Sequence, residues 1–136
     1  MAQHFTPEEA NRLLARIEPL LRALVEKRRA LLEQRGILAA FQATARGNGG
    51  VTRGPEVMAA REAVGRLAAQ LQEGIQEVQA LGCVVKDLEM GLVDFPAMRD
   101  GREVYLCWRL GEDRIAFWHG TDEGYAGRKP LADDPV

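Results

Sequence analysis

Cysteine is scarce in this sequence, and its spacing excludes two classes of site. Cys83 and Cys107 are the only cysteines among 136 residues, and each lies in an apolar run. They form no CxxC pair, which excludes a zinc knuckle and a thioredoxin-type motif. A buried thiol without a redox partner behaves as a small hydrophobic side chain. We therefore expect both cysteines to be reduced.

Long apolar runs are also missing. None approaches the ~20 residues that a helix needs to cross a bilayer. The first ten residues, MAQHFTPEEA, lack the basic and apolar segments of a secretory signal. With 46% hydrophobic and 28% charged residues, the composition is that of an ordinary globular protein. The sequence predicts one cytoplasmic domain over residues 1–136, with no membrane segment.

Basic charge is not concentrated on any one element. The net charge is −2, and residues 83–136 hold eleven acidic side chains against seven basic ones. An acidic surface repels phosphate backbones, so nucleic-acid binding is disfavoured. The one basic cluster is Lys27, Arg28 and Arg29. Consecutive helical residues fan around the axis, so this cluster does not form a binding stripe.

A first helix is predicted over residues 7–45. Thr6, Pro7 and Glu9 form a helix start, because threonine caps, proline suits the first helical position and glutamate completes a capping box. Apolar residues then recur at spacings of three and four and mark one buried stripe. Pro19 predicts a kink, since an interior proline lacks an N–H donor and crowds the preceding turn.

A glycine-rich loop and a second helix follow. Residues 46–54 contain four glycines, which predicts a flexible loop. The loop matches neither GxxxxGK[ST] nor GxGxxG, so we do not assign it to phosphate binding. The second helix is predicted over residues 55–81, with Gly82 as its terminator. Two such helices pack as an antiparallel hairpin and cover only one side of each other, which predicts a homo-oligomer and favours a dimer.

The sequence period changes after Gly82 from the helical one to an alternation of two, and β-branched and aromatic residues become frequent. We expect an antiparallel sheet of three to four strands within residues 83–119 and an extended tail over residues 120–136. The predicted fold class is α+β, with an N-terminal long antiparallel helical hairpin and then a small antiparallel sheet. The candidate strands are residues 83–88, 92–95, 103–110 and 114–119.

The predicted sheet carries many charged and ionisable side chains. Its carboxylates and His119 are oxygen and nitrogen ligands of the kind that hold a divalent metal or act in general acid–base chemistry. No spacing such as HExxH defines the set, and acidic groups near strand ends are often solvated. The candidate binding residues are Asp87, Glu89, Asp94, Trp108, Arg109, His119 and Arg128, and the candidate metal ligands are Asp87, Glu89, Asp94 and His119.

Several runs of the sequence are similar to one family. The chain resembles the uncharacterised bacterial family called domain of unknown function 2203, over nearly its whole length apart from the glycine-rich loop. The resemblance implies a bacterial cytoplasmic protein and implies no activity. Its distinctive runs coincide with the acidic sheet, which favours that region as the working surface. The runs are Phe5 to Leu14 with Pro19, Val85-Lys-Asp-Leu-Glu89, Gly91-Leu-Val-Asp-Phe-Pro96, Gly101 to Glu112, and Phe117-Trp-His119.

Three functional hypotheses remain open. The leading one is a non-catalytic, homo-oligomeric binding protein, in which the hairpin assembles subunits and the sheet edge presents Asp87, Glu89, Asp94, Arg109 and His119. The alternative is a small hydrolase-like enzyme in which Asp87, Glu89, Asp94 and His119 hold a divalent metal and a metal-bound water does the chemistry. The third is a regulator that docks on nucleic acid through the basic cluster. The first two predict that the acidic residues and His119 meet at one place.

Overall fold

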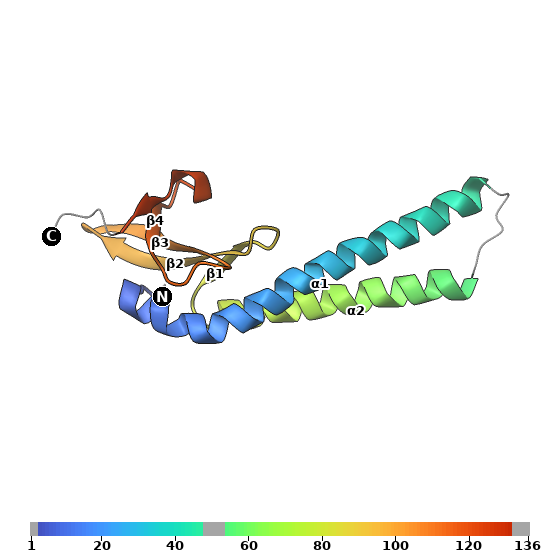
Figure 1. Cartoon of the computed structure of the whole chain (residues 1–136), viewed down its shortest axis with the longest axis horizontal. Helices are drawn as coiled ribbons and strands as arrows, with labels where there is room; N and C mark the ends of the chain where they lie inside the picture. The colour runs from blue at the N-terminus through green and yellow to red at the C-terminus, as the bar shows by residue number, and fades with distance from the viewer. Residues whose placement is uncertain (1–2, 48–53, 132–136) are drawn as a thin grey trace.

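Helices α1 (Pro7–Gly47) and α2 (Gly54–Gln79) form a long hairpin, and an antiparallel sheet follows them in the chain. The computed structural model describes residues 3–47 and 54–131. It confirms the predicted α+β fold, with the hairpin extending away from the sheet (Figure 1). The centre of the predicted glycine-rich loop, residues 48–53, lies outside the described residues. No helix within the described ranges is long and apolar enough to cross a membrane.

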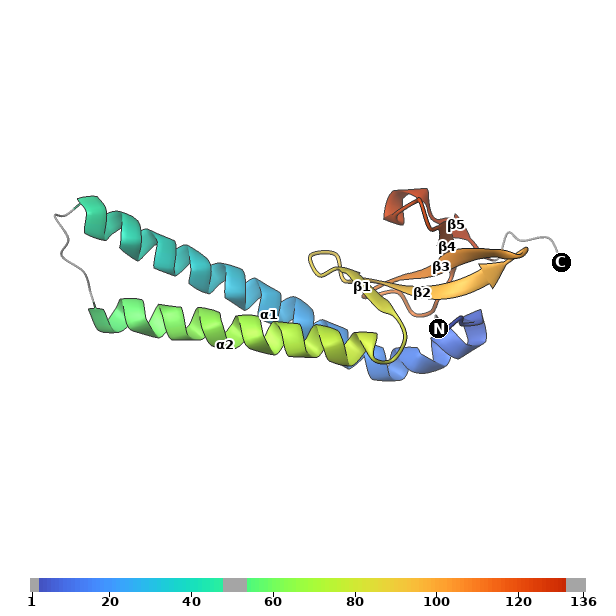
Figure 2. The same cartoon turned by 180° about the vertical axis from the view of Figure 1, so that it is seen from behind.

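The capping box predicted at the start of α1 is present. The backbone N–H of Glu9 donates to Thr6 Oγ1 at 3.1 Å, and the N–H of Thr6 donates to Glu9 Oε1 at 2.9 Å. These hydrogen bonds lower the pKa of Glu9, because they favour its charged form. The helix then continues through Pro19 and Gly36 and ends two residues beyond the predicted position. Figure 2 shows α1 passing beneath the sheet before it changes direction and enters the hairpin.

Two glycines, Gly74 within α2 and Gly82 shortly after its end, allow other elements to approach closely. Gly74 lies against α1, where a Cβ at this position would collide with the side chain of Leu24. The helix ends at Gln79, and Gly82 follows with a φ of 108°, in the left-handed region that favours glycine. A Cβ on Gly82 would lie 2.6 Å from the ring of Phe5. Gly82 therefore lets the chain turn from the helix into the sheet, as the sequence predicts.

The strands form a meander in which each strand pairs antiparallel with its neighbours in the chain. The predicted turn at Asp100 and Gly101 is present, and both residues have positive φ, 52° and 77°. The sequence predicts three to four strands, and the residues that the structure describes form five. They are β1 (Val84–Asp87), β2 (Leu92–Arg99), β3 (Arg102–Arg109), β4 (Phe117–Gly120) and β5 (Lys129–Pro130).

β2 continues through Pro96, although the sequence predicts a strand that stops at residue 95. Proline has no N–H, so it is tolerated in a strand only where no ladder bond is needed from it. The carbonyl of Pro96 accepts a hydrogen bond from the N–H of Phe5 at 2.7 Å. Since the N–H and C=O of a strand residue point to the same side, the missing donor removes no hydrogen bond to β3.

The end of the sheet also differs from the predicted pattern. β4 begins at Phe117 rather than at residue 114. Part of the predicted extended tail instead forms a 3₁₀ helix, η1 (Tyr125–Gly127), and β5, which pairs with β4 through Trp118 and Lys129. A two-residue strand that contains proline has no alternation for sequence analysis to detect, so its position depends on tertiary pairing.

One hydrophobic core connects the hairpin to one face of the sheet. Ile17 of α1 and Val78 of α2 pack with Phe95 and Trp108 of the sheet in a single buried cluster. The ring of Phe5 meets that of Phe95 edge-on, with 5.4 Å between their centroids. Because strand side chains alternate between faces, the neighbours of Phe95 and Trp108 point to the face away from the helices.

Thr6→Ala should lower the free energy of unfolding by about 1 kcal/mol, because it removes the acceptor for the Glu9 N–H. Thr44→Ala in the same helix is the matched control. The Thr44 hydroxyl donates to the Ala40 carbonyl at 2.9 Å on an exposed surface, so its loss should change stability by less than about 0.5 kcal/mol. Urea unfolding followed by far-UV circular dichroism measures both. Equal losses in the two variants would contradict the capping role.

Candidate functional site

Three residues with metal-ligating side chains meet on the sheet face away from the helices. Asp94 of β2 lies opposite Cys107 of β3, and His119 of β4 lies opposite Tyr105, two residues before Cys107. Residues two apart on a strand share a face, so the three side chains point the same way. Within the described ranges, Asp94, Cys107 and His119 are the only group of three or more such residues whose ligand atoms lie within 4.8 Å of one another.

This cluster, Asp94–Cys107–His119, is closed to solvent. The exposed fractions of the three residues are 2%, 1% and 2%. Buried ionisable groups are costly unless they are paired, so a fully buried carboxylate and imidazole require a defined arrangement of protons and hydrogen bonds.

The hydrogen bonds of His119 determine where its protons lie. Its Nδ1 is 2.8 Å from the carbonyl oxygen of Gly120, and its Nε2 is 3.0 Å from Asp94 Oδ2. A carbonyl oxygen only accepts, so Nδ1 must carry a hydrogen and donate it. One proton then lies between Nε2 and the Asp94 carboxyl, on one side or the other. In either arrangement the pair has no net charge.

Burial raises the pKa values of two acidic groups in the cluster, the carboxyl of Asp94 and the thiol of Cys107. It raises the pKa of Asp94 against the attraction of His119, because the charged carboxylate loses its hydration. Burial, together with the negative charge of Asp94, raises the pKa of the Cys107 thiol to about 11. Cys107 is therefore a neutral thiol at neutral pH, and it lies beside a neutral Asp94–His119 pair.

Arg128 covers the cluster from the segment between β4 and β5, residues 121–128, which we call the strap. Its guanidinium carbon lies 3.9 Å from the ring centroid of Phe117 and 4.3 Å from that of Tyr125. It donates to both carboxylate oxygens of Glu112, at 3.1 and 2.6 Å. One of its nitrogens is 4.0 Å from Cys107 Sγ. The strap is thus held by a two-point ion pair directly above the thiol.

The four predicted metal ligands do not meet at one place. The structure brings Asp94 and His119 together, but Asp87 is the last residue of β1 and Glu89 lies in the turn that follows. Asp87 Oδ1 accepts hydrogen bonds from the backbone N–H groups of Glu89, at 2.7 Å, and Met90, at 3.1 Å. These bonds stabilise the turn, and the side chain of Glu89 is exposed.

The other predicted binding residues have separate places. Trp108 lies in the core on the helix-facing side of the sheet, and its Nε1 donates to the carbonyl of Glu112 at 3.0 Å. Arg109 is exposed and donates to the hydroxyl of Tyr125 at 3.3 Å. Asp94 and His119 are buried, so the sheet edge does not present them as a surface. Of the predicted binding residues, Asp94 and His119 belong to the cluster and Arg128 lies beside it.

Cys107 is the member of the cluster that the sequence analysis missed. Alternation along the third strand places it on the face of Tyr105 and Arg109, but it cannot show which residues of other strands lie opposite. The β2–β3 register supplies this information. Cys83 and Cys107 are both free and buried, and their reduced state stays a prediction.

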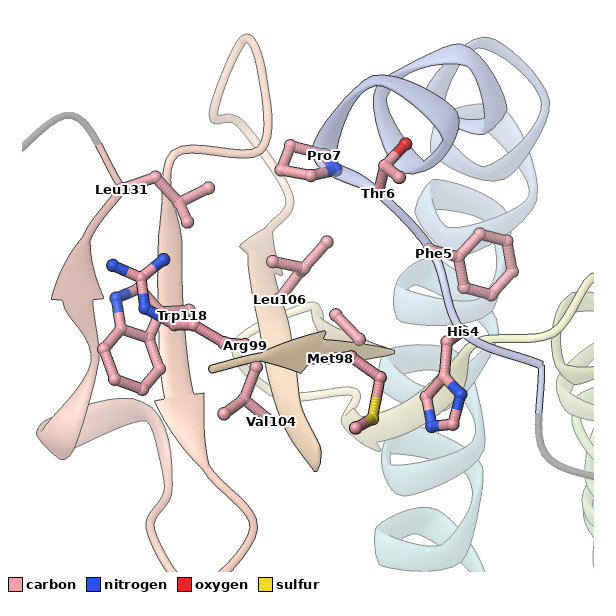
Figure 3. Close-up of a pocket in the computed structure, with 11 residues that line it drawn as sticks. His4, Phe5, Thr6, Pro7, Met98, Arg99, Val104, Leu106, Trp118 and Leu131 are labelled. Atoms are coloured by element: carbon pink, nitrogen blue, oxygen red, sulfur yellow. The ribbon is translucent and has the colours of Figure 1, made fainter. Parts of the chain in front are cut away.

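A separate pocket of about 220 Å³ lies on the helix-facing side of the sheet, between the N-terminal segment and the ends of the strands (Figure 3). Leu106, Trp118 and Leu131 form much of its apolar wall. The guanidinium of Arg99 lies 4.5 Å from the ring centroid of Trp118, at one side of the pocket. The sheet separates this pocket from the cluster, so the two are distinct features.

The sequence model of a family described as an uncharacterized conserved protein (DUF2203) matches residues 3–131. The chain belongs to this family. The resemblance seen in the sequence runs is therefore confirmed, and Asp94, Cys107 and His119 each lie in one of those runs. The searches of curated proteins and of solved structures each found no match for this member of the DUF2203 family.

Both thiols should react slowly in the folded protein, because burial raises the pKa of Cys83 and of Cys107 to about 11. At pH 8, only about one part in a thousand of such a thiol is the reactive thiolate. The measurement is labelling with a chromogenic disulfide reagent. In the time in which both thiols of the unfolded protein are labelled, fewer than one thiol per chain of the native protein should be labelled. Rapid labelling of one native thiol would contradict the burial of that cysteine.

Asp94→Ala should lower the free energy of unfolding by about 3–5 kcal/mol, because it leaves His119 Nε2 buried without its partner. Asp87→Ala is the matched control, and its loss of two exposed or half-buried hydrogen bonds should cost about 1–2 kcal/mol. Asp94→Asn keeps a hydrogen-bonding group at the site and should cost less than Asp94→Ala. Chemical unfolding measures the three variants, and similar losses for the two alanine variants would refute the special cost of the buried pair.

Proposed function

We propose that this DUF2203 protein is a non-catalytic homodimeric binding protein, in which the α1–α2 hairpin joins two copies and the sheet carries a buried binding site. The observation that carries the proposal is the lack of a core along most of the hairpin. Among the described hairpin residues between Leu24 and Val78, only Leu31 and Ala60 are buried. Two helices alone cannot cover their apolar faces, so a further element must pack on them.

Large apolar side chains remain exposed on the same hairpin. The exposed fractions of Leu32, Ile37 and Met58 are 46%, 39% and 61%. Single exposed aliphatic residues are ordinary, but here they accompany an extended pair of helices without a core. A second hairpin would convert the two-helix arrangement into a four-helix bundle, which buries these residues from all sides.

A groove supports the choice of a second copy as the partner. It measures about 750 Å³ and lies between the hairpin and β1, with Leu88 of the following turn. Leu32, Leu71 and Ile75 are among its apolar lining residues. Its charged lining residues are three basic ones, Arg28, Arg35 and Lys86, and one acidic one, Asp87. The exposed surface of α2 carries acidic residues, Glu62, Glu73 and Glu77. Opposite charges on one chain suit a two-fold contact, in which the same patch of each copy meets the other.

The burial of the cluster favours a binding protein over the hydrolase-like alternative. A hydrolytic metal needs an open coordination position that substrate and water can reach. Asp94, Cys107 and His119 are all enclosed. The nucleic-acid hypothesis has less support still, because Arg29 of the basic cluster already pairs with Glu26 at 2.9 Å and Arg28 lines the groove.

The full-length chain should sediment as a dimer with twice the mass of one chain. Leu32→Glu should raise the dimer dissociation constant at least about tenfold, because burial of a leucine contributes about 1.5–3 kcal/mol and 1.4 kcal/mol is a factor of ten. Met98→Glu is the matched control: Met98 is 52% exposed but lies in β2, away from the hairpin. Sedimentation equilibrium measures all three proteins. A monomeric wild type, or equal weakening by both substitutions, would overturn the proposed dimer.

A further inference from the structure

We propose that Asp94, Cys107 and His119 form a binding site for one Zn²⁺ ion per chain. The proposal deepens the proposed function by naming the ligand class of the sheet site, but it does not depend on dimerisation. It rests on three different ligand groups that three adjacent strands bring within 4.8 Å of one another. The remaining predicted ligands, Asp87 and Glu89, take no part in it.

The ligand chemistry and spacing suit zinc. Thiolate sulfur, imidazole nitrogen and carboxylate oxygen are its usual protein ligands, whereas Mg²⁺ and Ca²⁺ prefer oxygen alone. Two ligand atoms bound tetrahedrally at about 2.1 Å lie about 3.4 Å apart. His119 Nε2 and Asp94 Oδ2 are 3.0 Å apart. The separation of this pair therefore differs by only about 0.4 Å from that of two tetrahedral ligands.

His119 is already oriented as a zinc ligand. Its Nδ1 donates to the carbonyl of Gly120 at 2.8 Å, which fixes the ring and directs Nε2 toward Asp94 and Cys107. Metal-binding histidines commonly donate their second ring N–H to a backbone carbonyl in this way. The Gly120 carbonyl thus supplies the supporting contact that a zinc-bound imidazole needs.

Zinc binding also balances the charge of this buried region. The ion replaces two protons, the thiol proton of Cys107 and the proton shared by Asp94 and His119. The bound site then contains Zn²⁺, one thiolate, one carboxylate and a neutral imidazole, and its net charge is zero, as before. Arg128 above the thiol is compensated by Glu112, at 2.6 Å. The exchange therefore leaves no uncompensated buried charge.

The strap explains how a closed site holds the ion. Arg128 of the strap lies 4.0 Å from Cys107 Sγ, and its guanidinium packs on the rings of Phe117 and Tyr125, so the strap must open for the ion to enter or leave. Three protein ligands leave one coordination position of a tetrahedral ion for water, and the covered site keeps that position from substrates. These features fit a retained, non-catalytic ion.

The experiment measures Zn²⁺ and Co²⁺ binding to the full-length protein. We expect one Zn²⁺ per chain after refolding with the metal and dialysis, a raised Tm, and a thiolate-to-metal charge-transfer band when Co²⁺ replaces it. Cys107→Ala should abolish the band and weaken Zn²⁺ binding at least about hundredfold, since loss of even a supporting partner costs ten- to a hundredfold. Cys83→Ala is the matched control, because Cys83 is an equally buried cysteine outside the cluster, and it should keep both properties.

Wild-type protein that binds neither metal stoichiometrically would overturn the proposal, whatever the variants do. An equal loss on Cys83→Ala, or a loss on Asp87→Asn with none on Asp94→Asn, would also overturn it. The wild-type measurement keeps the test valid if Cys107→Ala fails to fold. Sedimentation of the protein with and without added zinc separates the two proposals. A dimer that binds no added zinc supports the dimer and refutes the zinc site, and a monomer that binds one zinc ion does the reverse.

Discussion

The register between β2 and β3 is the constraint on which both faces of the sheet depend. It pairs Val93 with Trp108 on the helix-facing side and Asp94 with Cys107 on the other. A shift of one residue would turn one of the two strands over relative to the other, so that either Asp94 would face the helices or Trp108 would leave the core. The positive φ angles of Asp100 and Gly101 define the turn that holds this register. Core packing and the cluster are therefore two results of one pairing.

Apolar surface is covered to different extents at the two ends of the molecule. At the sheet, α1 and α2 cover one face, and the strap with Arg128 covers part of the other. Among the hairpin residues with described side chains, only Leu31 and Ala60 are buried beyond the region that contacts the sheet. A single chain thus completes its core at one end only. This asymmetry, rather than any one exposed residue, is the structural basis for expecting a partner on the hairpin.

The buried polar cluster carries a cost that apolar residues at the same positions would avoid. Replacing a buried ion pair by well-packed hydrophobic residues is often neutral or stabilising. Asp94 and His119 satisfy each other, and Nδ1 of His119 is satisfied by Gly120, so the protein keeps a complete network there. A neutral, fully hydrogen-bonded cluster next to a thiol is an arrangement in which a divalent ion can replace protons without changing the net charge. Core packing alone gives no reason for this choice of residues.

The sequence by itself determined the features that depend on local contacts. The capping box of Thr6 and Glu9, the glycine terminator Gly82 and the Asp100–Gly101 turn involve residues close in the chain, so their patterns are readable without a fold. Only the tertiary structure decided that Cys107 lies beside Asp94 and His119, whereas Asp87 accepts hydrogen bonds from the backbone of a turn. It also decided that β2 continues through Pro96. These outcomes depend on which strands lie side by side, and the alternation of side chains along one strand carries no information about its neighbours.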